Sequence, residues 1–322
     1  MISNSPDLLD EAMKHQLVSV IIPTHNRPDY LEQAVTSVLN QTHKTIEIII
    51  VDDGSDKRHT EAIQRIAGMN PTIGLHRHET PKGPGYTRNL GLDKATGEFV
   101  LFLDDDDLLR PGMVADGLRQ FQRHPDSDVV VCAARTFGRL KTSGSVCSDK
   151  NTEIVAGGTD RLLKTTTPID LSVLQRIIIH IDACLVRRQA IGSIRFPEDL
   201  LIGEDTFFLL SLKHHDGAFR YYDVVNVFIR RHPYSITGSK RRYYRQIQNY
   251  YRKLLKSGML TKRKDIALAN VQLAYFKFRQ NPMAGFFNCS HIFKNIKPIL
   301  KALILFFYDR LRKQPHSFWR YL

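Results

Sequence analysis

The sequence predicts an α/β fold in which a mostly parallel sheet is flanked by helices. Three apolar runs, at 18–22, 46–51 and 99–103, are separated by stretches whose apolar residues recur at helical spacing. Such an alternation is typical of a parallel sheet that is covered on both faces. A polar cluster follows each run. Because the carboxyl ends of parallel strands meet at one edge, we expect the three clusters to form one ligand-binding rim.

The other elements follow from the same patterns. The β-branched run 18–22 is halted by Pro23, and the run 46–51 ends at Asp52 and Asp53. The remaining predicted elements, in chain order, are a helix over 28–41, a helix over 57–67, a strand near 73–77, a loop over 81–85, a helix over 86–95, a strand over 128–136, an irregular Ser/Thr/Gly-rich stretch to about 167, strand-like residues over 177–187, a helix from 203 to about 215, one or two strands over 219–230, and basic helices beyond 240.

Composition excludes several protein classes. Of the 322 residues, 42% are hydrophobic and 25% are charged, which excludes a disordered chain. The four cysteines, Cys132, Cys147, Cys184 and Cys289, are scattered, so we expect buried thiols and a reducing compartment. Residues 1 to 16 lack the apolar core of a signal peptide, and no apolar run is long enough to cross a bilayer. We therefore expect a cytoplasmic protein, peripheral on the inner face of the cell membrane.

The positive charge is concentrated in the last third of the chain. The formal net charge is +13, yet residues 230–322 alone carry +19 and residues 1–229 carry −6. Within this region, apolar residues recur at helical spacing over 292–307, with lysines between them. A basic amphipathic helix of this kind suits an anionic membrane surface. Packing on the preceding domain explains the same pattern equally well. We do not expect nucleic-acid binding, because no recognised module is present.

Four consecutive aspartates, Asp104, Asp105, Asp106 and Asp107, follow the third apolar run directly. Like charges this close raise one another's pKa unless a cation screens them. A hard divalent ion such as Mg²⁺ or Mn²⁺, held by carboxylates and substrate phosphates, fits this requirement. The alternative is a solvated acidic turn before the next helix. The second acidic pair, Asp52 and Asp53, favours the metal, although Asp52-Asp53-Gly54-Ser55 also fits a plain turn with Ser55 as the helix cap.

Five segments in this order and spacing resemble the family 2 glycosyltransferases. They are Val18 to Arg27, Ser37 to Thr42, Val51 to Ser55, Gly83 to Asn89, and Ala95 to Asp107. The resemblance covers about ninety residues almost without interruption. It implies a GT-A fold with a Rossmann-like sheet and a basic helical C-terminal extension. The implied domains are a catalytic domain over 1–238, with a nucleotide-sugar-binding part at 17–136 and an acceptor part at 168–238, and a basic helical region over 239–322.

The resemblance assigns the donor site residue by residue. Asp53 would hydrogen-bond the base, with Asp52 supporting the turn. Asp104 and Asp106 are the outer residues of its DxD motif, with Asp106 the first candidate for metal ligation, while Asp105 or Asp104 would hold the ribose. Further donor-binding candidates are Pro23, Thr24, His25, Arg27 and Arg88. For His25 a plain loop histidine, and for Arg88 a salt bridge on the helix surface, are alternatives.

The second half matches the family less fully. Glu204-Asp205 resembles its Glu-Asp motif, so Asp205 would be the general base and Glu204 would orient the acceptor. The alternative is that both carboxylates only complement a helix N-terminus. Arg230 and Arg231 would neutralise the departing diphosphate, and His232 is either a further metal ligand or a plain loop histidine. The tryptophan motif of processive synthases is absent, which favours transfer of one sugar per encounter.

We therefore expect an inverting hexosyltransferase that takes a sugar from a nucleoside diphosphate, UDP in the first instance, with Mn²⁺ or Mg²⁺ as cofactor. Its acceptor would be a hydroxyl of a glycan or a lipid-linked glycan, as in cell-envelope polysaccharide synthesis. A sugar nucleotidyltransferase would need a glycine-rich phosphate loop after the first strand, where Pro23-Thr24-His25-Asn26 stands. An inactive adaptor that binds membrane or nucleic acid through the basic tail is the other alternative.

Overall fold

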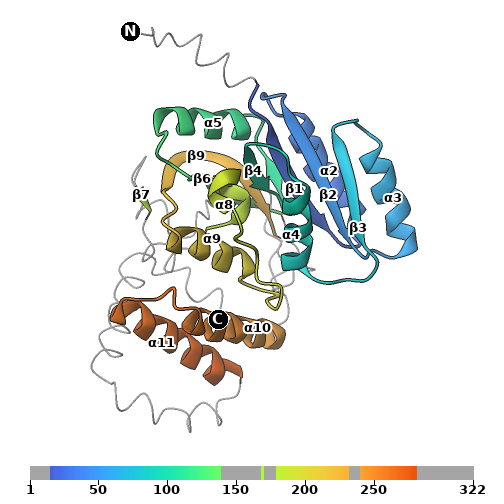
Figure 1. The fold of residues 1–322 in the computed structure, drawn as a ribbon. Coiled ribbons are helices and arrows are strands. Elements are labelled where there is room, and N and C mark those ends of the chain that lie inside the picture. Colours follow the sequence, from blue (N-terminus) through green and yellow to red (C-terminus); the bar gives the residue numbers. More distant parts are fainter. Residues whose placement is uncertain (1–14, 139–167, 170–178, 232–239, 281–322) are drawn as a thin grey trace, which may run out of the picture. The chain divides into compact units, whose positions relative to one another are not determined.

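The computed structural model describes residues 15–138, 168–169, 179–231 and 240–280 (Figure 1). The chain divides into two compact units, with the boundary between residues 235 and 236. Within the described residues, nine strands of the first unit form one sheet in the order β3-β2-β1-β4-β8-β6-β9-β5, and β7 pairs with β9. Two helices of the second unit are described. That the two units match functional domains stays a prediction.

The N-terminal half of the sheet has the predicted alternation of strands and helices. Its elements are β1 (Val18–Thr24), α2 (Pro28–Leu39), β2 (Ile46–Asp53), α3 (Lys57–Ala67), β3 (Ile73–His78), α4 (Pro84–Lys94) and β4 (Phe99–Phe102). The four strands are parallel, and almost every side chain of β1, β2 and β4 is buried. Right-handed crossovers that run first outward to β3 and then back to β4 put α4 on the opposite face from α2 (Figure 1). The predicted α/β class is confirmed.

The second half extends the sheet with mixed pairing. Its elements are β5 (Leu108–Leu109), α5 (Met113–Arg123), β6 (Val129–Phe137), β7 (Pro168–Ile169), the 3-10 turn η1 (Ile181–Ala183), β8 (Cys184–Arg187), α8 (Arg188–Ile191), α9 (Glu204–His214) and β9 (Phe219–Arg230). β8 is antiparallel to β4 and β6, whereas β6 and β9 are parallel, with register shifts around Ala133. These shifts bend the long strand β9, so that its end pairs with β5 beside the aspartate run.

Two local predictions need correction. Within the described part of the range expected as a strand, 179–187, only residues 184–187 form one, because residues 181–183 form a 3-10 turn. Residues 177–178 lie outside the described residues. The cap of α3 is Asp56, since its carboxylate accepts a hydrogen bond from the His59 backbone amide, and Ser55 does not cap the helix. The Ser55 hydroxyl instead accepts a hydrogen bond from the Asn26 amide across the sheet edge.

One carboxylate, that of Glu47, links the amino ends of the parallel strands. Glu47 accepts hydrogen bonds from the Ser19 hydroxyl at 2.5 Å and from the backbone amides of Thr96 and Gly97 at 2.7 and 3.0 Å. Burial acts to raise the pKa of Glu47, but these hydrogen bonds outweigh it, so the pKa is lowered. Glu47 therefore links β1, β2 and the turn before β4, and it does so best when ionised.

We expect Glu47→Gln to destabilise the protein at pH 7 by on the order of 1.5 kcal/mol, because the charged acceptor is lost. A lowered folded-state pKa means that this stabilisation is fully present above the ordinary glutamate pKa of about 4.3 and is lost as the pH falls further. Urea unfolding should therefore show that the difference in unfolding free energy between the wild type and Glu47→Gln is smaller at about pH 3 than at pH 7. The exposed Glu61→Gln is the control; an equal loss at both pH values would contradict the prediction.

The second unit contains α10 (Lys240–Lys256) and α11 (Arg263–Gln280), which pack on each other. The Gln248 side chain, on α10, donates hydrogen bonds to the Phe276 carbonyl at 3.1 Å and to the Gln280 side chain at 2.7 Å. The basic helical character expected beyond residue 240 is present in both helices. The amphipathic segment 292–307 lies outside the described residues. Over the part of the chain that is described, no helix combines the length and apolarity that crossing a membrane requires.

Candidate active site

Three polar clusters meet at the carboxyl edge of the parallel strands, as predicted. The ends of β1 and β2 lie side by side, with Thr24 opposite Asp52, and Leu103, just past β4, bonds to Ile21 of β1. The aspartate run therefore lies next to the end of β1 and forms the turn between β4 and β5. Asp105 and Asp107 are buried, whereas Asp104 and Asp106 are partly exposed. The outer residues of the predicted DxD motif are thus the two that solvent reaches.

Arg27 screens the middle of the aspartate run. Its guanidinium lies 2.6 Å from the Asp105 carboxylate and 2.7 Å from that of Asp106, and the Thr24 hydroxyl also donates to Asp105 at 2.7 Å. Burial raises the pKa of Asp105 to about 7, although Arg27 and Thr24 act in the opposite direction. Arg27 and Thr24, both predicted donor-binding residues, therefore hold the aspartates directly in this structure.

Arg88 screens the other side of the run and reaches the second predicted motif. It bonds to Asp104 at 2.5 Å and to Glu204 at 2.7 Å. Arg88 is 4% exposed, so the alternative of a salt bridge on the helix surface is wrong. Burial raises the pKa of Glu204 to about 7, while Arg88 lowers it. Burial alone would lower the pKa of Arg88, but the facing carboxylates raise it, so the guanidinium stays charged.

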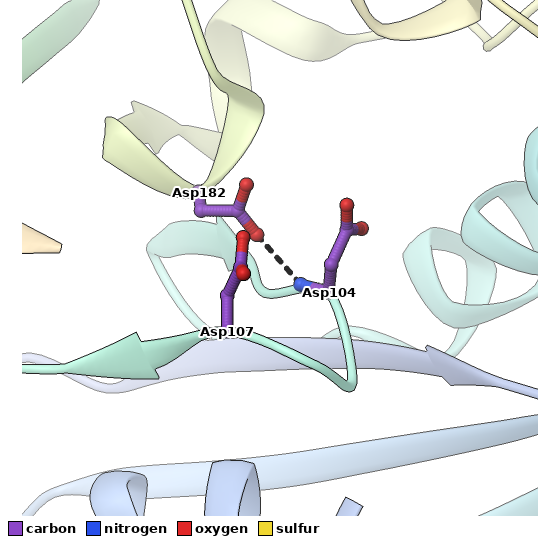
Figure 2. Close-up of side chains that lie close together, drawn as sticks. All are labelled: Asp104, Asp107 and Asp182. Carbon is purple, nitrogen blue, oxygen red and sulfur yellow. Dashed lines mark hydrogen bonds between the residues drawn. The ribbon is translucent and has the colours of Figure 1, made fainter. Parts of the chain in front are cut away.

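Asp104 belongs to a group of three carboxylates with Asp107 and Asp182, whose ligand atoms lie within 4.8 Å of one another (Figure 2). Asp182, in η1, also accepts a hydrogen bond from the Asp104 amide at 2.6 Å. Burial and the neighbouring carboxylates raise the pKa of both Asp107 and Asp182. An all-oxygen, partly buried donor set of this kind fits Mg²⁺ or Mn²⁺. Asp106, the first candidate from the sequence, is not in this group and pairs with Arg27; which carboxylates bind a metal stays a prediction.

Sequence reasoning missed Asp182 and gave Asp107 no role. Asp182 is the only acidic residue in the mostly apolar stretch Ile177 to Val186, which also contains His180, and this single carboxylate is the signal that was available. Because an ionised side chain is costly to bury without partners, an aspartate in a buried strand context calls for a nearby donor or cation. The sequence could not say that this donor is the Asp104 amide, which lies 78 positions earlier.

The turn after β2 is held rigidly. The two carboxylate oxygens of Asp53 accept hydrogen bonds from the amides of Lys82 and Gly83, each at 2.8 Å, and His25 bonds to the Asp53 carbonyl at 2.7 Å. Asp52 accepts from the Ser55 amide and pairs with Arg77. Gly54 has a φ of +66°, and a Cβ there would lie 2.7 Å from the backbone of Pro81. The predicted nucleotide turn is therefore held by hydrogen bonds and close packing against the loop that precedes α4. Pro23, a further predicted donor-binding residue, lies near the end of β1.

Arg230 is bound to the aspartate turn. Its amide donates to Asp107 at 2.7 Å, its Nε donates to the Asp106 carbonyl at 2.7 Å, and its guanidinium packs against Phe137. The Arg231 amide bonds to the Phe137 carbonyl. His232 lies outside the described residues, so its metal role is not placed. Contact of either arginine with a diphosphate stays a prediction.

Glu204 and Asp205 begin α9 directly after Gly203, which has a φ of +82°. The Asp205 carboxylate accepts a hydrogen bond from the Thr206 amide at 2.6 Å, as expected at a helix N-terminus. Glu204 is buried and Asp205 is partly exposed. Arg88 bridges Glu204 and Asp104, because its guanidinium bonds to both carboxylates. The structure thus brings the aspartate run and the Glu-Asp motif into one site.

The mostly parallel sheet with carboxylates at its strand ends agrees with the GT-A fold that the resemblance to family 2 glycosyltransferases implies, and comparison with known proteins supports this class. The model of Glycosyl transferase family 2 matches residues 19–178. An uncharacterized glycosyltransferase of Haemophilus influenzae is 32% identical over 231 residues, which span 71% of this chain and 84% of that protein. The chain belongs to glycosyltransferase family 2. A GalNAc(5)-diNAcBac-PP-undecaprenol beta-1,3-glucosyltransferase of Campylobacter jejuni is 42% identical over 99 residues, 30% of this chain and 32% of that protein.

Solved structures show the same fold at low sequence identity. Residues 1–349 of S. aureus TarS, in complex with UDP-GlcNAc, align with a TM-score of 0.58 and 20% identity, over 89% of this chain and 79% of that one. The mannosyltransferase PcManGT of Pyrobaculum calidifontis, in complex with GDP-Man and Mn²⁺, aligns with a TM-score of 0.59 and 18% identity, over 94% of this chain and 82% of that one. The predicted GT-A fold is confirmed.

Proposed function

We propose that this glycosyltransferase moves a single sugar from a UDP-sugar to a hydroxyl of a glycan or lipid-linked acceptor, with inversion. The observation that carries the proposal is the placement of Asp104 and Glu204 on the two ends of one buried guanidinium, that of Arg88. This contact joins a carboxylate edge suited to a nucleotide sugar with a motif suited to acceptor deprotonation. The UDP-GlcNAc complex of TarS, which shares the fold, supports the choice of UDP.

The proposed chemistry divides the work between two sets of carboxylates. Asp53 and Asp52 would hold the base, with Pro23, Thr24 and His25 lining its pocket, and the aspartate run would hold the ribose and diphosphate. A divalent ion, when bound by Asp104 and Asp106 or by Asp104, Asp107 and Asp182, neutralises phosphate charge. Asp205 would take the proton from the acceptor hydroxyl as its oxygen attacks the anomeric carbon. The departing diphosphate would meet Arg27, Arg230 and Arg231.

The acceptor class is supported by one relative. The Campylobacter jejuni protein is named for an undecaprenol-linked acceptor, which would be presented at a membrane. An enzyme of this kind would work at the inner face of the cell membrane, and residues 239–322 would supply a basic surface toward anionic lipid. The adaptor and nucleotidyltransferase alternatives are not favoured, because the chain belongs to a transferase family and has its carboxylates at the strand ends.

A thermal-shift screen with UDP, GDP and dTDP, with and without Mn²⁺, tests the donor and metal assignments together. We expect UDP with Mn²⁺ to raise the melting temperature most, because a ligand at 100 times its Kd adds about 2.7 kcal/mol of stability. Asp106→Ala should remove the metal-dependent part if Asp104 and Asp106 bind the ion, and should leave it if Asp104, Asp107 and Asp182 do. Asp126→Ala, at an aspartate side chain that is 72% exposed, is the matched control. An undiminished Mn²⁺-dependent shift in Asp106→Ala would reject Asp106 as a ligand.

A further inference from the structure

We propose that Arg88 and Asn89 are positioning residues that fix the Glu204-Asp205 motif relative to Asp104, and that Arg88 does not itself bind the donor. The inference rests on the proposed function and replaces the donor-binding role that the sequence suggested for Arg88. Two neighbouring residues of α4 support the proposal. The Arg88 side chain bonds to two carboxylates, and the Asn89 side chain bonds to the backbone of Phe196.

Both terminal nitrogens of the Arg88 guanidinium are bonded to carboxylates of the protein. One terminal nitrogen bonds to Asp104 and the other to Glu204, and the plane packs on the ring of Phe196 at 5.6 Å. Each terminal nitrogen keeps a second N–H, and Nε has no hydrogen-bond partner among the described residues. Because Arg88 is only 4% exposed, however, binding a phosphate would mean drawing the guanidinium away from one of these two carboxylates. Giving one up would leave a charge uncompensated in a buried site, which is strongly unfavourable. Arg88 is therefore better suited to holding protein groups than to holding a ligand.

Asn89 holds the segment that leads into the Glu-Asp motif. Its side-chain oxygen Oδ1 accepts a hydrogen bond from the Phe196 backbone amide at 2.8 Å. Its side-chain nitrogen Nδ2 donates to the Phe196 backbone carbonyl at 3.0 Å and to the Glu198 carboxylate at 3.1 Å. Asn89 thereby takes both backbone hydrogen-bonding groups of Phe196 in the manner of a strand neighbour. Only six residues, 197–202, then separate Phe196 from Gly203, the residue that precedes α9. The two side chains thus hold the motif at both ends of this segment.

The consequence is that α4 sets the spacing between the two halves of the site. Asp104 is bonded to η1 through Asp182 and to α9 through Arg88, so the aspartate turn and the base-bearing helix move as one body. In-line attack depends on that spacing, since small misplacements of reacting groups lower the rate without removing either group. A positioning role therefore predicts a loss of kcat with donor affinity retained.

The first test separates positioning from donor binding. Arg88→Lys keeps the charge but cannot bond to two carboxylates in a fixed fork, and Asn89→Ala frees the Phe196 backbone. We expect each to lower kcat for transfer at least tenfold while the Kd for UDP with Mn²⁺, by calorimetry, stays within threefold. Arg195→Lys is the control, because Arg195 pairs with the exposed Asp93 of α4 and, within the described part of the chain, forms no ion pair with Asp104 or Glu204. A rise in the UDP Kd that matches the loss of kcat would overturn the proposal.

The second test does not require activity. The unfolding midpoints of Arg88→Lys, Glu204→Gln and the double variant are compared in urea. Because the two side chains share one contact, the shift of the double variant should be clearly smaller than the sum of the single shifts. Additive shifts would overturn the link. If the wild-type protein bound no UDP, the proposed function would fail, while this cycle would still decide whether Arg88 joins the two motifs.

Discussion

Asp205→Asn is expected to lower kcat for sugar transfer by about 100- to 10,000-fold, the usual contribution of a general base. Asparagine has nearly the same shape and retains an oxygen that can accept the hydrogen bond from the Thr206 amide, so α9 should keep its start. It cannot accept the proton of the acceptor hydroxyl. The measurement is the rate of transfer from the UDP-sugar that the donor screen selects, at saturating donor and acceptor.

The same variant should bind UDP with Mn²⁺ as the wild type does, because Asp205 is assigned to the acceptor. Asp223→Asn, at an exposed position in β9, provides the matched control and should leave kcat unchanged. Wild-type kcat in Asp205→Asn would show that another group takes the proton. A parallel loss of UDP affinity would mean instead that Asp205 contributes to the donor site.

Phe208→Ala is expected to destabilise the protein by about 3–5 kcal/mol, the usual cost of removing a buried phenyl ring. Phe208, on α9, is fully buried, and its ring stacks on that of Phe196 at 4.0 Å and meets the edge of Phe102 at 5.7 Å. These three rings fill the space between β4, the 196–203 segment and the helix that carries Asp205. Urea unfolding monitored by circular dichroism measures the loss.

Phe207→Ala on the same helix is the matched control, because Phe207 is only half-buried. We expect it to cost less than half as much, since the removed ring was already in partial contact with water. Equal losses would show that the aromatic cluster is not the packing unit beneath the site. The active-site motif would then rest on other contacts.

Local patterns were enough to predict the N-terminal half of the fold. The mainly apolar runs at 18–22, 46–51 and 99–103 are almost completely buried, and no other element type accommodates such runs between amphipathic helices as well. The second half was predicted less completely. β8 is short and antiparallel, and residues 181–183 turn aside, because pairing with β4 and β6 decides their conformation. No local periodicity records a partner that is about eighty residues away.

Much of the candidate site was also readable from residue types. Asp52 and Asp53 end β2 and the aspartate run follows β4, so parallel pairing alone brings them to one edge. The contribution of Asp182 was not readable, because its importance depends on the Asp104 amide that it meets. The same holds for Arg88, whose burial between two carboxylates depends on how α4 packs against α9.

By itself the sequence determined that four aspartates stand at a strand end and need a counter-charge, because like charges that close are costly when they are not screened. Only the tertiary structure decided which cations supply it. Arg27, the residue before α2, pairs with Asp105 and Asp106, and Arg88 from α4 pairs with Asp104. The reason is physical: a charge is recorded in the sequence, whereas its compensation depends on distances and burial that arise only when distant segments pack together.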